Sequence, residues 1–115
     1  MLYQGSCHCG RVSFQVEGTI ASALACNCSM CSRKGSLLWF VPHSQLQLLS
    51  AEANAATYTF NRHKIKHRFC PTCGIHPYGE ASDPTGKAMA AVNIRCLEGI
   101  DLAQIPVTHN DGRAV

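Results

Sequence analysis

Seven of the eight cysteines in this 115-residue chain fall into three short groups, and this arrangement constrains the fold more than any other feature. The groups are Cys7-His8-Cys9, Cys26-Asn27-Cys28-Ser29-Met30-Cys31 and Cys70-Pro71-Thr72-Cys73, and Cys96 stands apart from them. Cysteines at such density form disulfides in an oxidising compartment or bind metal in a reducing one.

Segments outside the cysteine groups indicate the compartment. Residues 1–6 contain no basic start and no apolar run, so we expect no signal peptide. The sequence has no run of about 18 apolar residues, so it predicts no membrane span. We therefore expect a cytoplasmic protein, one domain over residues 1–115, whose cysteines bind metal.

The two outer groups supply four thiols, the number that a structural zinc ion binds in a tetrahedron. Cys70-x-x-Cys73-Gly74 is typical of a zinc knuckle, because glycine permits the left-handed turn that follows the second ligand. A knuckle needs two further ligands, and Cys7 and Cys9 can provide them. Zinc at these four residues would add folding free energy on the order of 10 kcal/mol.

Three other interpretations of the outer cysteines are weaker. A redox dithiol at Cys70 and Cys73 needs a helix after its first cysteine, which Gly74 and Pro77 prevent. A disulfide between Cys7 and Cys9 would close a strained ring around one intervening residue. An iron site of rubredoxin type is the third, and a colourless protein would exclude it.

The central group, Cys26, Cys28 and Cys31, offers three thiols with no evident fourth ligand. Three protein ligands and one open position are the arrangement of catalytic zinc, so these three residues are the catalytic candidates. Arg33 and Lys34 could offset the charge of the cluster, although two solvated cations are the simpler interpretation.

The alternative for the central group is a closed site with a fourth ligand from elsewhere, namely Cys96, His8 or His76. Cys96 has no partner at knuckle spacing, so we expect a buried free thiol. We expect His76 to pack or to form hydrogen bonds.

Hydrophobic periodicity predicts an all-β, antiparallel fold with metal-binding loops at the strand ends. Val12, Phe14 and Val16 alternate with polar residues, and the apolar run over residues 37–41 predicts a strand buried on both faces. We expect one helical turn over residues 30–34, ended by Gly35, and a loop or single turn over 51–56. The expected strands are 11–17, 20–26, 37–41, 46–49, 57–60, 62–69, 88–96 and 105–109.

Four cations alternate along the strand expected at 62–69, so Arg62, Lys64, Lys66 and Arg68 would share one face. Such a face could bind phosphate, or it could protect an edge strand against pairing with another chain. The formal net charge is only +3, which favours the edge strand and makes a nucleic-acid partner the weaker prediction.

Three motifs together resemble the glutathione-dependent formaldehyde-activating enzyme and centromere protein V family. They are Gly5-Ser6-Cys7-His8-Cys9-Gly10, Cys26-Asn27-Cys28-Ser29-Met30-Cys31 and Phe69-Cys70-Pro71-Thr72-Cys73-Gly74, and their order and spacing match over nearly the whole chain. Residues 74–78 and 93–96 look closer to the centromere protein V side of this family.

The resemblance implies a β-tent of antiparallel sheets and two Zn²⁺ sites. A structural zinc would be held by Cys7, Cys9, Cys70 and Cys73. A second zinc on Cys26, Cys28 and Cys31 would accept the sulfur of glutathione. The implied reaction is reversible addition of glutathione to formaldehyde, which gives S-(hydroxymethyl)glutathione and belongs to the carbon–sulfur lyases.

Two functional hypotheses follow from the sequence. The first is a zinc-dependent carbon–sulfur lyase that acts on a thiol–aldehyde adduct, with a small thiol such as glutathione as its partner. The second is a non-catalytic module, stapled by zinc, that binds nucleic acid or a protein through the basic strand. The sequence points to no acid–base pair beside the central cysteines.

Overall fold

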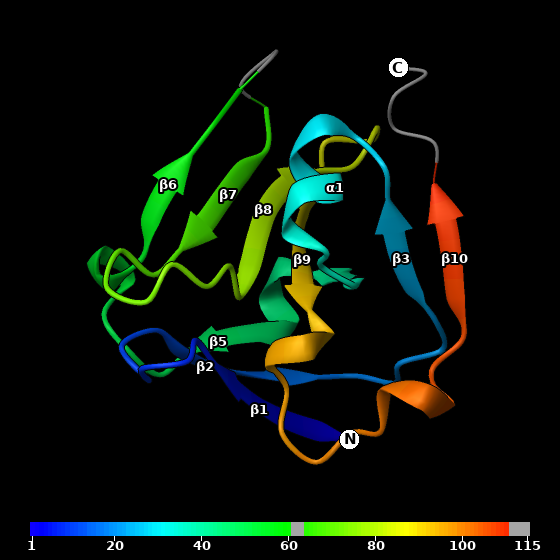
Figure 1. Ribbon diagram of the computed structural model, residues 1–115, viewed down its shortest axis with the longest axis horizontal. Helices are drawn as coiled ribbons and strands as arrows, with labels where there is room; N and C mark the ends of the chain where they lie inside the picture. The colour runs from blue at the N-terminus through cyan, green and yellow to red at the C-terminus, as the bar shows by residue number, and fades with distance from the viewer. Residues whose placement is uncertain (61–63, 111–115) are drawn as a thin grey trace.

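The chain forms two β-sheets in a computed structural model, which describes residues 1–60 and 64–110 (Figure 1). The smaller sheet has the strand order β1-β2-β5 and the larger one β10-β3-β4-β9-β8-β7-β6. Figure 1 shows the small sheet at the bottom of the view, its strands crossing the direction of those above. The strands are β1 (Leu2–Ser6), β2 (Ser13–Glu17), β3 (Ala23–Cys26), β4 (Leu38–Pro42), β5 (Leu46–Leu48), β6 (Ala56–Tyr58), β7 (Lys66–Phe69), β8 (Tyr78–Ser82), β9 (Ala88–Asn93) and β10 (Val107–Asn110).

The helical segments are single turns, so the all-β prediction is confirmed. α1 (Ser29–Lys34) begins after Cys28, and it ends at Gly35, whose φ of 69° is left-handed as expected. The 3₁₀ turns are η1 (His43–Gln45), η2 (Glu52–Asn54), η3 (Ile94–Cys96) and η4 (Leu102–Gln104). In the described residues, no helix has the length and apolar character that a membrane crossing requires.

The apolar face of β2 joins the two sheets. Val12, Phe14 and Val16 are all buried, as their alternation predicts. The ring of Phe14 lies 6.2 Å from that of Tyr78 on β8, so this contact connects the small sheet to the large one. Gly5 on β1 has to be glycine, because a Cβ there would lie 2.6 Å from the Phe14 ring.

Two strands have no counterpart in the prediction. β1 buries only Gly5, and β8 contains a glycine and a glutamate, so neither shows a strong strand pattern. Their neighbours define them, because β1 pairs with β2, and β8 lies between β7 and β9. Cross-strand pairing therefore decides these two elements and local propensity does not.

The sheets are antiparallel except at one edge. β10 pairs with β3 in parallel, from Val107 opposite Ala23 to Asn110 opposite Cys26, so the prediction of purely antiparallel sheets is wrong there. A parallel pair requires a long crossover, and most of the chain lies between these two strands. Periodicity within a strand cannot reveal the direction of its partner.

Each expected strand overlaps an observed one, but their bounds differ, and one strand also differs in burial. The strand expected at 88–96 ends at Asn93, where η3 begins, and that at 62–69 starts only at Lys66. Residues 62 and 63 of the latter lie outside the described part of the chain. β4 is buried on one face only, because Phe40 is 48% exposed between the buried Trp39 and Val41.

Candidate metal centres and the adjoining cavity

The four outer cysteines come together from two turns. Cys7 and Cys9 lie between β1 and β2, whereas Cys70 and Cys73 lie between β7 and β8. All four sulfurs lie within 4.8 Å of one another, and Cys9 Sγ is 3.7 Å from Cys7 Sγ and 3.6 Å from Cys70 Sγ. A tetrahedral ion bound at about 2.3 Å from each sulfur requires sulfur separations of about 3.8 Å. The cluster could therefore hold a metal ion, and its geometry suits zinc.

Backbone N–H groups stabilise negative charge on this cluster. The N–H of Val12 donates to Cys7 Sγ at 3.3 Å, and that of Cys73 donates to Cys70 Sγ at 3.4 Å. Gly74, with φ of 80°, closes the turn after the second ligand through a 2.8 Å bond from its N–H to the carbonyl of Cys70. Hydrogen bonds of this kind favour the thiolate form of a cysteine, which is the form that binds metal.

The thiol of Cys73 illustrates the balance of these effects. Burial favours its neutral form, but hydrogen bonds from the backbone N–H groups of Cys9 and Ile75 outweigh burial and lower the pKa of Cys73 to about 6. A thiol with such a pKa is largely ionised at neutral pH, so it can bind a metal ion as the thiolate.

The central three cysteines form a second cluster. Cys26 ends β3, Cys28 caps the N-terminus of α1, and Cys31 lies within that helix. Their sulfurs lie within 4.8 Å of one another. The N–H of Cys28 donates to Cys26 Sγ at 3.4 Å, and that of Cys31 donates to Cys28 Sγ at 3.3 Å. The short helix therefore positions two of the three sulfurs.

Among residues 1–60 and 64–110, no histidine, further cysteine or carboxylate joins this cluster as a fourth member. Cys96 lies near the other cluster. Burial and then the charges of Cys7 and Cys73 raise the pKa of its thiol to about 11. It is half-buried beside the four-cysteine cluster, so it cannot complete the site on Cys26, Cys28 and Cys31.

The three-cysteine cluster borders a cavity of about 200 Å³. Residues of α1, β3, β4, β7, β8 and β9 line it, so it lies between the short helix and the large sheet. Phe40 lines this cavity, which explains why one face of β4 carries an exposed apolar ring.

Lys34 points into the same cavity and is half-buried, so its interpretation as a solvated cation is wrong. Its Nζ lies 3.1 Å from Nδ1 of His67. Burial lowers the pKa of Lys34 to about 8, although the negative charges of Cys31 and Cys28 act in the opposite direction. Arg33 is exposed as expected, and it donates to the carbonyl of Ser29 at 2.7 Å.

Two histidines complete the polar end of the cavity. The sequence does not predict His67 as a site residue, and it offers His76 only as an alternative fourth ligand of the central cysteines. His67 and His76 are 7% and 9% exposed, with ring centroids 5.7 Å apart. Burial, followed by the charge of Lys34, lowers the pKa of His67 to about 4, and the same causes together with His67 lower that of His76 to about 3. Both rings are therefore neutral at pH 7.

The contact with Lys34 determines the tautomer of His67. A lysine ammonium only donates, so Nδ1 of His67 accepts, and its Nε2 carries the hydrogen. Nε2 is buried, and in the described part of the chain no acceptor lies within hydrogen-bond distance of it. The same holds for both ring nitrogens of His76, which packs as expected but forms no such bond.

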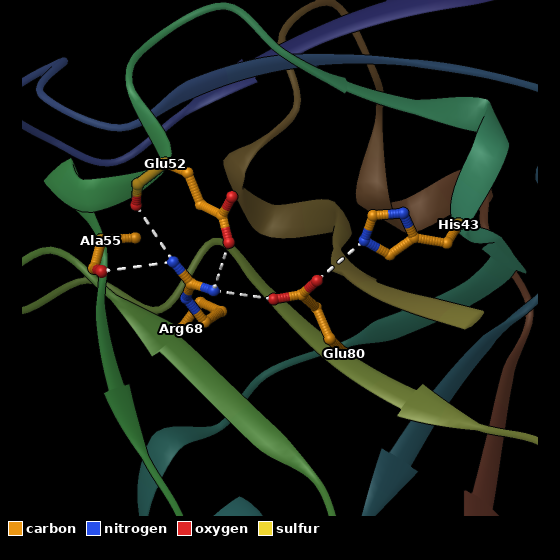
Figure 2. Close-up of polar contacts among 5 residues, drawn as sticks. All are labelled: His43, Glu52, Ala55, Arg68 and Glu80. Carbon is orange, nitrogen blue, oxygen red and sulfur yellow. Dashed lines mark hydrogen bonds and ion pairs between the residues drawn. The ribbon is translucent and has the colours of Figure 1, made fainter. Parts of the chain in front are cut away.

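The basic strand does not exist as predicted. Lys64 lies outside β7, Arg62 lies outside the described residues, and β7 is an inner strand between β6 and β8. Arg68 is buried and donates to Glu80 Oε1 at 2.8 Å, as Figure 2 shows. The interpretation as a protected edge strand is therefore wrong, and the buried Arg68 does not share an exposed face with the other cations. Anion binding by the remaining cations stays a prediction.

The fold and the two clusters define a class of small β-sheet proteins in which four cysteines join two turns and three further cysteines border a cavity. The chain belongs to the glutathione-dependent formaldehyde-activating enzyme family, whose sequence profile matches residues 2–109. This membership confirms the resemblance and supports a formaldehyde-activating or related function. The family name implies glutathione as a small-molecule thiol partner.

The fold is similar to that of a solved protein from Rhodobacter sphaeroides. The two sequences are 33% identical, the match covers 91% of this chain and 99% of that chain, and the TM-score is 0.78.

Proposed function

We propose that this protein is a zinc-dependent carbon–sulfur lyase that adds a thiol to an aldehyde and reverses the addition. Cys26, Cys28 and Cys31 would form the catalytic site, with glutathione and formaldehyde as the pair that the family name suggests. The observation that carries the proposal is that three sulfurs, one ligand short of a tetrahedron, form part of the wall of a cavity.

Zinc is the metal that the two clusters fit, because all their donors are thiols and no other ligand type takes part among the described residues. We assign a structural role to the ion on Cys7, Cys9, Cys70 and Cys73, since that set is complete. Zinc on the other three cysteines would supply a Lewis acid that deprotonates a substrate thiol.

The surrounding residues would hold the substrate. Three thiolates and one divalent cation carry a net charge of −1, and an incoming thiolate would make it −2. The ammonium of Lys34 interacts electrostatically with Cys31 and Cys28, so it would offset this charge and favour the bound thiolate. The apolar walls of the cavity would exclude water from the reacting sulfur.

The reaction needs no oxidant or reductant. The sulfur–carbon bond forms, the carbonyl π bond breaks, and the proton that leaves the thiol ends on the carbonyl oxygen. The neutral ring of His67 would donate a hydrogen bond through Nε2 to that oxygen.

The test replaces zinc with cobalt(II), which occupies tetrahedral thiolate sites and absorbs visible light. Addition of glutathione should change the absorption of one of two cobalt ions per chain. Lys34→Met should weaken the glutathione affinity about tenfold, which corresponds to about 1.4 kcal/mol. Arg33→Met, a matched loss of the neighbouring exposed cation, should leave the affinity unchanged.

A cobalt spectrum that does not respond to millimolar thiol would contradict the proposal. Equal effects of Lys34→Met and Arg33→Met would contradict the role of Lys34. We favour the enzyme over the alternative of a nucleic-acid-binding module, because Arg68, one of the four cations of the expected basic face, is buried.

A further inference from the structure

The cavity beside the three-cysteine cluster has two chemically different parts. Lys34, His67 and His76 lie with the cysteines and form a polar end. The other walls are mainly apolar, with side chains of Leu24, Leu38, Phe40, Phe60 and Ile65. A ligand that fills this cavity has to be amphipathic.

The polar end contains donor groups that need a partner. His67 is more than nine-tenths buried, and its Nε2–H has no acceptor within hydrogen-bond distance in the described chain. A buried donor without an acceptor destabilises the folded state, because it has lost its hydrogen bonds to water. A ligand oxygen beside the cysteine sulfurs would remove this cost.

The apolar part holds no free charge among the described lining residues. Glu80 also borders the cavity, but its two oxygens are engaged, one by Arg68 at 2.8 Å and the other by His43 at 2.8 Å (Figure 2). Lys34, the one cation in the described lining, is turned toward His67. These walls therefore match an uncharged, apolar group and do not match a carboxylate.

The volume indicates the size of that group. The cavity has about 200 Å³, and an apolar cavity of about 150 Å³ binds benzene. The single CH₂ group that formaldehyde contributes to the adduct would fill only a small part of this space. Water would fill the remainder poorly, because it needs two to four polar partners.

The rim provides an independent observation. Phe40 on β4 is 48% exposed and Ile65, just before β7, is 49% exposed, and both border the cavity. Large apolar side chains gathered around one opening indicate a surface that a ligand covers.

From these observations we propose that the substrate carries an apolar group of about the size of a benzene ring on its sulfur-bearing carbon. The substrate class is then the hemithioacetal of an aromatic or medium-chain aldehyde, and its hydroxyl lies at the polar end. The inference rests on the function proposed above, and its bond changes are the same: the thiol adds to the aldehyde carbon, and the thiol proton ends on oxygen.

The experiment measures thiol binding to the protein loaded with two cobalt ions, followed by the cobalt spectrum and by calorimetry. Phenylmethanethiol and 2-mercaptoethanol are the probes, since they differ in the group on the sulfur-bearing carbon. Phenylmethanethiol should bind at least tenfold more tightly. In a second assay, the exchange between aldehyde and hemithioacetal should be catalysed better for phenylacetaldehyde than for formaldehyde with one thiol.

Variants at the rim locate the effect. Phe40→Ser and Ile65→Ser should each weaken phenylmethanethiol binding about fivefold and leave 2-mercaptoethanol unchanged. Leu49→Ser is the matched control, because Leu49 is 52% exposed and does not border this cavity. All three positions are solvent-exposed, so the variants should remain folded.

Equal affinities for the two thiols, or equal losses for both in Phe40→Ser, would overturn this inference and leave the proposed function intact. A cobalt spectrum that responds to neither thiol would overturn the proposed function and this inference with it.

Discussion

At the scale of single residues, His67 shows how the fold changes the chemistry of a side chain. It lies on β7 between two basic neighbours, yet its ring is buried, stacked on Phe60 at 5.4 Å and bonded to Lys34. Burial and a neighbouring cation both oppose protonation, so the imidazole can only act as a neutral hydrogen-bonding group at pH 7.

We predict that His67 and His76 stay neutral as the pH falls from 8 to about 5.5. Their folded pKa values of about 4 and 3 lie below the value of about 6.5 expected in the unfolded chain. Ring nitrogen shifts in NMR spectra of the zinc-loaded protein should therefore not change over this range. Titration midpoints near pH 6.5 for both rings would contradict the prediction, because they would show that burial does not lower the two pKa values.

The same shifts have a defined effect on stability. Below pH 6.5 the unfolded chain binds protons at both histidines and the folded chain does not, so the unfolded state gains. Their contribution to stability is complete above pH 6.5 and is lost as the pH falls through about 4. Acid should therefore destabilise the protein as the pH falls from about 6.5 to about 4.

The sequence predicted the cysteines at this scale, but it did not predict Lys34 and His67 as members of the site. The ligand spacings are local, and each pair is separated by one or two residues. The contact between Lys34 and His67 joins residues 33 positions apart and depends on how α1 packs against β7. No local pattern carries that information.

At the scale of elements, one buried arginine ties η2, β7 and β8 together. The guanidinium of Arg68 donates to Glu80 Oε1 at 2.8 Å, to the carbonyl of Glu52 at 3.0 Å and to that of Ala55 at 3.3 Å (Figure 2). This network holds the β7–β8 pair, whose connecting turn carries Cys70 and Cys73.

Arg68→Met should lower the free energy of unfolding by about 3 kcal/mol, because it leaves a partly buried carboxylate and two carbonyl groups without the guanidinium that donates to them. Lys66→Met, an exposed cation on the same strand, should change it by less than about 0.5 kcal/mol. Urea unfolding of the zinc-saturated proteins measures both. Arg68→Lys should recover only part of the loss, since lysine lacks the planar fork.

Equal effects of the substitutions at Arg68 and Lys66 would mean that the network contributes little. The sequence signal was misleading here, because the alternation of Lys66 and Arg68 with other residues is typical of an exposed face. Arg68 instead forms an ion pair with Glu80 on the neighbouring strand β8, and it is buried there.

At the scale of the whole molecule, the four-cysteine cluster connects the two sheets. Its first pair lies in the β1–β2 turn of the small sheet, and its second in the β7–β8 turn of the large sheet. The three-cysteine cluster, by contrast, lies on neighbouring segments of one region, β3 and α1. Loss of metal at the two places should therefore have different consequences.

Cys73→Ser should unfold the protein or lower its midpoint of thermal unfolding by more than 10 °C, because zinc binding there contributes folding free energy on the order of 10 kcal/mol. Cys31→Ser should keep the fold with one zinc per chain in place of two. Circular dichroism and elemental analysis measure these outcomes. A weak chelator should remove the zinc of the three-cysteine site first, and simultaneous loss of both ions would contradict the separate roles.

The sequence by itself determined the two cysteine pairs, the cysteine triplet, the alternation of β2 and the helical turn that ends at Gly35, because each depends on residues close together in the chain. The tertiary structure alone decided the strands β1 and β8, the parallel pairing of β10, and the cavity that joins Lys34 and His67 to the cysteines. These features arise from contacts between distant segments, where burial and cross-strand pairing outweigh local preference.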